Sequence, residues 1–218
     1  MHIGEKKSNE FVGRAVNDLV DGHKERRNTM KEQLKIAETV VTNGIDVTEF
    51  EKTVQAVREQ PELAKFQFRA GNRWEMGGYN RTTIRGFYGA GEEHGAADRT
   101  FVVHADEPPI LLGEDRAPNP VEYLLHALAA CLTSTIIYKA AARGIKIESV
   151  ESTLEGNLDA RAFLEVSNDE RKGYTNIRVT FKVDSDASPE EIKEMAEFSP
   201  VFDVITNGTP VSLQIEKV

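Results

Sequence analysis

The sequence has little of what several classes of protein require. Its 218 residues include a single cysteine, Cys131, so an internal disulfide is excluded. The first residues lack the apolar run that a secretory signal requires, and we expect a cytoplasmic protein. Lys and Arg total 27 against 36 Asp and Glu, which gives a formal net charge of -9. Such a charge repels polyphosphate and anionic lipid, so we expect neither nucleic acid nor a membrane as a partner.

Signals for metals and common cofactors are also missing. Most of the five histidines are scattered without ligand spacing, and His126 lies about 140° around a helix from Cys131. The glycine-rich GAGEEHGA at 89–96 is followed by no helix, which favours a hairpin connection over a phosphate loop. No serine nucleophile elbow or paired-carboxylate motif occurs. We expect no metal and no cofactor.

The first 60 residues show helical patterns with polar surfaces. A capping box at Thr29 and Glu32 predicts a helix through Val41, which Asn43-Gly44 ends. A second capping box, Thr48 to Glu51, predicts a helix that ends before Pro61. We therefore expect an N-terminal helical extension at 1–62 and a second domain at 63–218.

From residue 66 the hydrophobic period changes to two, which is typical of strands. Extended runs are predicted in 66–74, 82–89, 99–106, 146–158, 174–183 and 211–218. A capping box from Ser188 to Glu191, with Pro189 at the first helical position, predicts a helix over 186–198. The predicted fold class is α+β, with a helical arm followed by the order βββ-α-ββ-α-β and an antiparallel meander at its start.

The most apolar stretch, 119–138, predicts a long central helix. Asn119 can cap it, Pro120 suits its first position and Gly144 ends it, so it spans about 24 residues or roughly 36 Å. Glu122 and His126 would cost several kcal/mol inside a lone membrane span. The helix is apolar nearly all round and must be covered on several sides, so we expect it to pack on a sheet and under a second subunit.

This element order, with a cysteine in the middle of the long helix, resembles the OsmC/Ohr family of osmotically inducible and organic hydroperoxide resistance proteins. The likeness rests on Leu112-Gly113, on Asn119-Pro120 leading to Ala130-Cys131, on Arg143-Gly144, and on the segments 199–203 and 206–211. The resemblance covers about 66–218 and leaves the helical arm outside.

The resemblance implies an intertwined homodimer with two sites at the interface. In the peroxidase branches one cysteine attacks the O–O bond of a hydroperoxide, an Arg and a Glu hold it as thiolate, and a second cysteine resolves the sulfenic acid. Carried onto this chain, the attacking cysteine is Cys131. The best match for the arginine is Arg81, with Arg73 and Arg85 close behind.

The chain departs from the peroxidase pattern in two places. Ser199 stands where the resolving cysteine would be, so an external thiol reductant is required. Val121 occupies the position of the activating carboxylate, and Glu122, one step later, lies about 180° around the helix from Cys131, so it could serve only across the dimer.

Two hypotheses remain for the function. The sequence leaves two interpretations of Cys131 open: a buried core residue, as free cysteines often are, or a nucleophile in an apolar pocket. Thr135 shares its helix face and could donate a hydrogen bond to the sulfur, although a helical hydroxyl commonly bonds its own backbone. The first hypothesis is a thiol-dependent reductase of small hydrophobic hydroperoxides. The second is a non-catalytic dimer that binds a small hydrophobic ligand near Glu122, Thr135 and Ser199.

Overall fold

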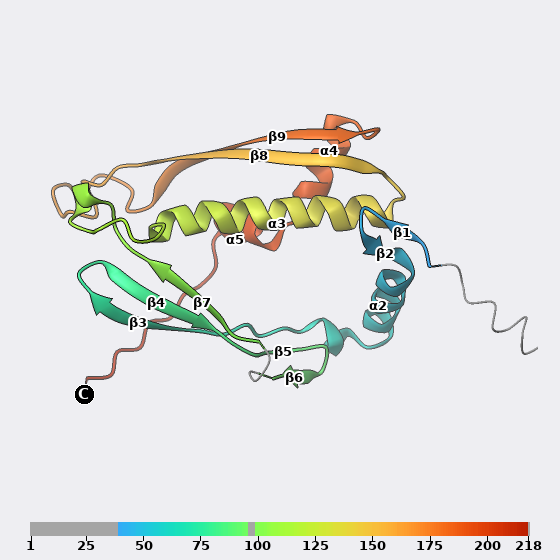
Figure 1. Cartoon of the computed structure of the whole chain (residues 1–218), viewed down its shortest axis with the longest axis horizontal. Helices are drawn as coiled ribbons and strands as arrows, with labels where there is room; N and C mark the ends of the chain where they lie inside the picture. Colours follow the sequence, from blue (N-terminus) through green and yellow to red (C-terminus); the bar gives the residue numbers. More distant parts are fainter. Residues whose placement is uncertain (1–38, 96–98, 218) are drawn as a thin grey trace, which may run out of the picture. The chain divides into compact units, whose positions relative to one another are not determined.

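The computed structural model describes residues 39–95 and 99–217 (Figure 1). It begins with a short hairpin of β1 (Val41–Thr42) and β2 (Ile45–Asp46). The sequence predicted a helix that reaches Val41 and stops at Asn43-Gly44. This prediction is wrong for residues 41–44, which belong to the hairpin. Asn43 and Gly44 have φ of 53° and 78°, which suits a tight two-residue hairpin turn. The rest of that predicted helix, with its capping box at Thr29, lies outside the described residues.

Helix α2 (Val47–Glu59) follows directly, and the short 3-10 helix η1 (Pro61–Ala64) comes after it. The N-cap of α2 is Asp46, whose side chain accepts the Glu49 N–H at 2.9 Å. The predicted cap at Thr48 is therefore wrong by two residues. The ring of Phe50 lies 5.9 Å from that of Tyr138 in the long helix. Residues from Val41 onward thus form one compact unit. The domain boundary between 62 and 63 stays a prediction.

A three-stranded antiparallel sheet comes next, in the order β3-β4-β7. Its strands are β3 (Ala70–Met76), β4 (Tyr79–Ile84) and β7 (Phe101–Ala105). The antiparallel meander is confirmed, although β3 begins four residues later than its pattern suggested and the run predicted at 82–89 is divided between β4 and a strand of another sheet. Hydrophobic side chains are exposed on both faces: Trp74 on one face is 69% exposed, and Val102 on the other is 47% exposed.

The glycine-rich segment forms a separate hairpin, β5 (Phe87–Gly89) with β6 (Glu92–His94). Ala90 and Gly91 turn it with φ of 50° and 85°. The predicted hairpin connection is therefore confirmed.

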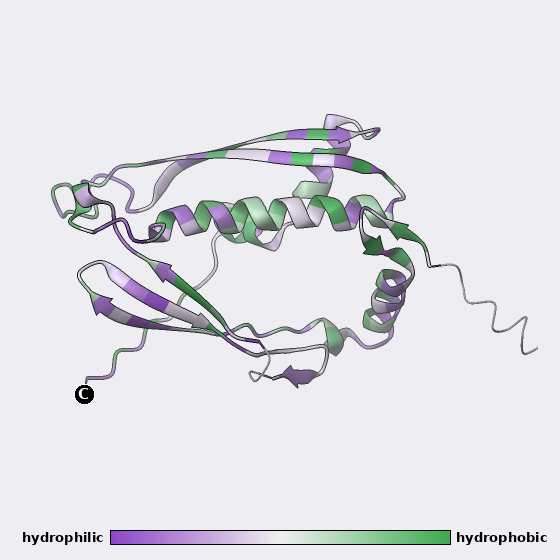
Figure 2. Ribbon diagram, in the orientation of Figure 1, coloured by the Kyte–Doolittle hydropathy of each residue, from purple (hydrophilic) through white to green (hydrophobic). Residues whose placement is uncertain are grey.

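The long helix α3 (Pro120–Ala142) has the predicted start and length. The long hairpin of β8 (Ile147–Leu158) and β9 (Tyr174–Ser185) lies along it in Figure 1, and α4 (Pro189–Ala196) packs against it. Hydrophobic and polar residues alternate along both strands, whereas α3 is hydrophobic over most of its surface (Figure 2). The core lies between these elements, with Ile136, Ala140 and Met195 fully buried.

The chain after α4 differs from the prediction. Residues Pro200–Asn207 form a further short helix, α5, which the sequence pattern did not reveal. The strand predicted for 211–218 is absent from the described residues, which end at 217 and form no regular element there. Val211, Leu213 and Ile215 are 77%, 87% and 87% exposed. The α+β class is confirmed, and the last β of the predicted order is not found.

Candidate functional site

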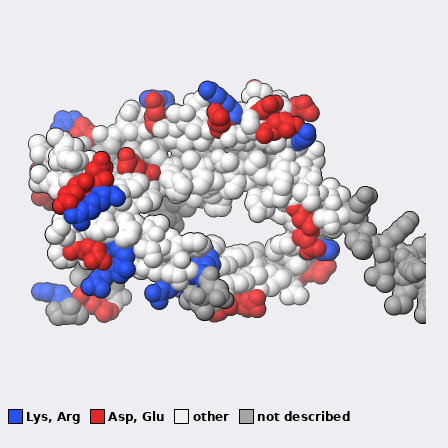
Figure 3. Space-filling view, viewed as in Figure 1, with Lys and Arg blue, Asp and Glu red and all other residues white. Residues whose placement is uncertain are grey.

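Cys131 lies at the middle of α3, on a side of the helix that the rest of the described chain leaves partly open. It is half-buried and free. Leu124 and Tyr138, seven residues before and after it, share this side and are 40% and 47% exposed. A neighbouring stripe is closed: Leu128 and Leu132, about 60° and 100° around the helix from Cys131, are 3% and 4% exposed. In Figure 3 a broad area without charged side chains lies over α3. The thiol therefore belongs to an uncovered apolar surface.

The hydroxyls near Cys131 bond its backbone. Thr135 Oγ1 donates to the Cys131 carbonyl oxygen at 2.7 Å, and Ser134 Oγ donates to the same oxygen at 3.1 Å. This is the common bonding of a helical hydroxyl to the preceding turn. Neither hydroxyl is directed at the sulfur in this structure, and a ligand-binding role of Thr135 stays a prediction.

Arg81 lies at the centre of the β3-β4-β7 sheet. It faces Arg73 on β3 and His104 on β7 in the strand register. Its Nε is buried without a hydrogen-bond partner in the described chain, and the nearest carboxylate oxygen, Oε1 of Glu75, is 3.6 Å away. Within one chain no hydrogen bond or ion pair joins Arg81 to Cys131 among the described residues. The guanidinium is therefore a cation that lacks one of its ordinary hydrogen bonds.

Glu122 is engaged at the start of α3. Its carboxylate accepts the Asn119 N–H at 2.8 Å, and Asn119 Oδ1 accepts the Glu122 N–H at 2.9 Å, which completes a capping box. Val121 offers no side-chain chemistry, but its carbonyl oxygen accepts the Tyr174 hydroxyl at 2.9 Å. Burial, and then the charge of Glu122, raises the pKa of Tyr174. These contacts fix the end of the helix that precedes Cys131.

Ser199 is fully buried and caps α5. Its Oγ accepts the Phe202 N–H at 3.2 Å. This contact accounts for a polar residue in the interior, since an unbonded amide there would be costly. A ligand-binding role for Ser199 stays a prediction beside this structural one.

The loop before α3 is organised by a residue that sequence reasoning missed. Asp106 is 2% exposed and accepts the N–H groups of Glu107, Glu114 and Arg116. Burial raises its pKa, but these backbone hydrogen bonds outweigh burial, so the pKa lies below its usual value. A Cβ on Gly113 would overlap the Glu107 carbonyl, so the Leu112-Gly113 motif requires glycine there. The sequence signal for this loop was Asp106 followed by Pro108-Pro109 and by Gly113.

Two described histidines, His94 and His104, have partners other than metals. Tyr79 Oη lies 2.7 Å from His104 Nδ1, and His94 Nε2 lies 3.1 Å from the Gly89 carbonyl oxygen. In the ranges 39–95 and 99–217 no three His, Cys, Asp or Glu side chains gather in a way that could hold a metal ion.

Comparisons with known proteins bear on the part of the chain that carries Cys131. Residues 113–214 match the family described as OsmC-like protein. These residues form an OsmC-like domain. The resemblance inferred from Asn119-Pro120 and Ala130-Cys131 is thereby confirmed. A search of curated proteins finds no significant match.

Several solved structures resemble about two thirds of this chain. An OsmC-like protein from Mycoplasma pneumoniae is 18% identical, with 64% of this chain and 86% of that chain covered and a TM-score of 0.48. An organic hydroperoxide resistance protein OsmC from Legionella pneumophila is 20% identical, with 65% and 90% covered and a TM-score of 0.43. An OsmC-like protein of unknown function from Vibrio cholerae is 13% identical, with 66% and 93% covered and a TM-score of 0.44.

Helix α3 also meets the length and composition of a membrane span. This is weak evidence, because the core helix of a soluble protein passes the same test. In the OsmC-like domain one side of α3 contacts β8, α4 and α5, which accounts for its apolar character on that side.

Proposed function

We propose that this OsmC-like protein is a cytoplasmic homodimer that reduces small hydrophobic hydroperoxides through Cys131, with an external thiol as reductant. The observation that carries the proposal is the position of Cys131. The cysteine of the family motif stands midway along α3, on its partly open apolar side, between Leu124 and Tyr138. A second copy that covered this side would place the sulfur in an apolar crevice, where an alkyl hydroperoxide fits and water is scarce.

Several unpartnered surfaces support the dimer. The β3-β4-β7 sheet is open on both faces, although a sheet of this size needs a packed layer to be stable. The segment after α5 has the alternation of a strand, but no strand of the described residues pairs with it, and Leu213 and Ile215 are both 87% exposed. A second identical chain offers a sheet to each α3 and an edge to each terminal segment, so one symmetric association would satisfy both.

The proposed dimer also gives Arg81 a role. Its buried Nε has no hydrogen-bond partner within the described chain. If the sheet of one copy covers α3 of the other, Arg81 of one copy can approach Cys131 of the other. A guanidinium near the sulfur favours the thiolate, which is the form that attacks.

The proposed chemistry proceeds in three steps. The Cys131 thiolate attacks the terminal oxygen of ROOH, the O–O bond breaks, and the alkoxide leaves with a proton as ROH, so that sulfur is oxidised to a sulfenic acid. An external thiol condenses with the sulfenic acid, releasing water and forming a mixed disulfide. A second thiol attacks the external sulfur of that disulfide, which releases an external disulfide and returns Cys131 to its reduced form.

Peroxide consumption tests this proposal. We expect purified protein to consume cumene hydroperoxide when dithiothreitol is present, and dimedone to label Cys131 when the dithiol is omitted. Cys131→Ser should abolish both signals. Ser134→Ala, which alters a hydroxyl on the same turn, should keep both. Equal peroxide consumption by wild type and Cys131→Ser would reject the proposal.

A second candidate function is binding of a small hydrophobic ligand in the same interfacial crevice without catalysis. It is favoured by the contacts of Glu122 and Ser199, because both side chains cap helices and neither stands beside the sulfur. Organic extraction of native protein followed by mass spectrometry separates the two candidates. A stoichiometric apolar molecule without peroxide turnover supports this second function, and turnover by protein that carries none rejects it.

A further inference from the structure

A second candidate site lies within a single chain, on the closed side of α3. Two adjoining cavities of about 450 Å³ and 230 Å³ follow the inner face of β9, and both are walled by Val179 and Phe202. Together they form a groove between β9, α3, α4 and α5, which we call the β9 groove. Its floor includes Leu128 and Leu132, the buried stripe of α3, about 60° and 100° around the helix from Cys131, which does not line either cavity.

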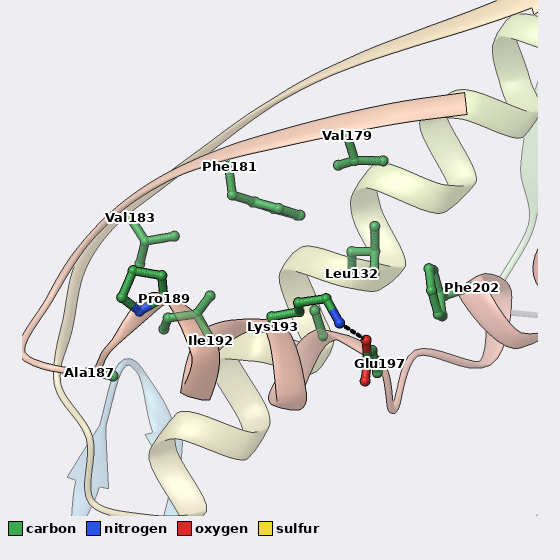
Figure 4. A pocket seen from close by; sticks show the side chains of 11 residues that line it. Leu132, Val179, Phe181, Val183, Ala187, Pro189, Ile192, Lys193, Glu197 and Phe202 are labelled. Atoms are coloured by element: carbon green, nitrogen blue, oxygen red, sulfur yellow. Dashed lines mark hydrogen bonds and ion pairs between the residues drawn. The ribbon is translucent and has the colours of Figure 1, made fainter. Parts of the chain in front are cut away.

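The larger part of the β9 groove is apolar. Figure 4 shows Val179, Phe181 and Val183 extending from β9 toward Leu132 and Ile192, with Phe202 of α5 at one end. The only charged residues of its lining, Lys193 and Glu197, pair with each other. A cavity of this size and lining is typical of sites for small apolar ligands.

The smaller part is polar at its far end, where it is lined by Arg171, Thr175 and Asn176. Arg171 forms no hydrogen bond or ion pair with any described residue, whereas its neighbour in the same loop, Arg161, pairs with Asp159 and Glu170. A guanidinium carries donors in a fork that matches a carboxylate. The β9 groove thus joins a long apolar wall to one available cation.

The shape of the groove favours a slender occupant. Leu128, Leu132 and Ile192 are only 3%, 4% and 8% exposed although they line the two cavities. A broad protein surface could not reach side chains so nearly closed off, but a single hydrocarbon chain could. We propose that the β9 groove binds a single-chain amphiphile with an anionic head, its chain along β9 and its carboxylate at Arg171. This ligand is separate from the hydroperoxide proposed for Cys131.

Calorimetric titration with dodecanoate below its micellar concentration tests the proposal. We expect one dodecanoate per chain, and affinity that rises with each added methylene between octanoate and dodecanoate by up to about fourfold. Dodecyltrimethylammonium, which has the same chain and a cationic head, should bind more weakly. Affinity that depends on protein concentration, or one dodecanoate per two chains, would show that a second copy occupies the groove and would overturn the proposal.

Two variants and a matched control locate the site. Arg171→Gln changes an exposed residue and should weaken dodecanoate binding by roughly three- to tenfold while dodecanol binding is unchanged. Val179→Trp should fill the junction of the two cavities and abolish binding of both probes. Arg178→Gln removes the same charge from the outer face of β9 and should bind as wild type. No binding by wild type, or equal weakening by Arg171→Gln and Arg178→Gln, would overturn the inference.

Failure of this inference can be told apart from failure of the proposed peroxidase function. Cys131→Ser should bind dodecanoate with wild-type affinity, because its side chain does not line the groove. Arg171→Gln should consume cumene hydroperoxide at the wild-type rate. Loss of dodecanoate binding in Cys131→Ser would mean that the two ligands share one site, and the separate groove would be rejected.

Discussion

Replacement of Ser199 by alanine separates a structural role of this residue from a chemical one. Ser199 is fully buried, and its Oγ accepts the Phe202 N–H at 3.2 Å at the start of α5. Loss of a serine cap costs about 0.5–2 kcal/mol in general. An amide left buried without a partner costs about 1–3 kcal/mol. We therefore expect Ser199→Ala to lower the free energy of unfolding by about 1.5–2 kcal/mol.

The assay is thermal unfolding at neutral pH. For a chain of 150–250 residues, each kcal/mol corresponds to about 2–4 °C, so Tm should fall by roughly 3–8 °C. Ser188→Ala is the matched control, because Ser188 caps α4 through the Glu191 N–H at an exposed site and should cost about 1 kcal/mol or less. Peroxide consumption by folded Ser199→Ala should equal that of wild type. A variant with unchanged Tm and lost turnover would refute the structural role and identify Ser199 as a site residue.

Three further changes test how α3 and its surroundings are held. Tyr174→Phe removes a hydroxyl whose pKa is raised by burial. The stability that this raised pKa contributes is present below about pH 10 and is lost as pH rises through the folded pKa. In urea titrations the variant should therefore lose less stability than wild type between about pH 9 and 11. Ile136→Ala empties a fully buried position and should cost about 2–5 kcal/mol by urea unfolding. Gly113→Ala places a Cβ on the Glu107 carbonyl and should lower Tm, whereas Gly71→Ala, with open space around it, should not.

Local signals in the sequence predicted the elements that depend on local chemistry. Asn119 and Pro120 mark the start of α3, Ser188 and Glu191 form the predicted capping box of α4, and the alternation over 174–183 corresponds to β9. Each of these is decided within a few residues by a cap or by a period, and tertiary packing reinforces it.

The short elements were missed because their signals compete. Asn43-Gly44 serves equally as a helix stop and as a hairpin turn. The Asn43 side chain bonds the backbone of Ile145 and Ile147, about 100 residues away, which supports the hairpin. Ser199-Pro200 is an N-cap followed by proline, which should have indicated α5. Eight residues are too few for the helical period to be recognised beside the following turn.

The candidate site was predictable in its centre and not in its surroundings. Cys131 is placed by the helix pattern alone. The side chains expected around it are engaged elsewhere: Glu122 and Ser199 cap helices, and Thr135 bonds the Cys131 carbonyl. The capping role of Glu122 was available from its spacing to Asn119, since the third helical residue commonly completes a capping box. The backbone bonding of Thr135 was among the expectations, whereas the capping roles of Glu122 and Ser199 were not.

The missing terminal strand follows from the physics of sheets. Alternation states which side chains of 211–217 would share a face, but a strand exists only when another strand satisfies its backbone. Within one described chain no strand lies beside this segment, so its apolar residues remain exposed. Arg81, whose buried Nε is unbonded, and the open side of α3 around Cys131 likewise lack a partner within the described chain. In the proposed dimer one symmetric association would satisfy all three features, so the proposed chemistry depends on the oligomeric state.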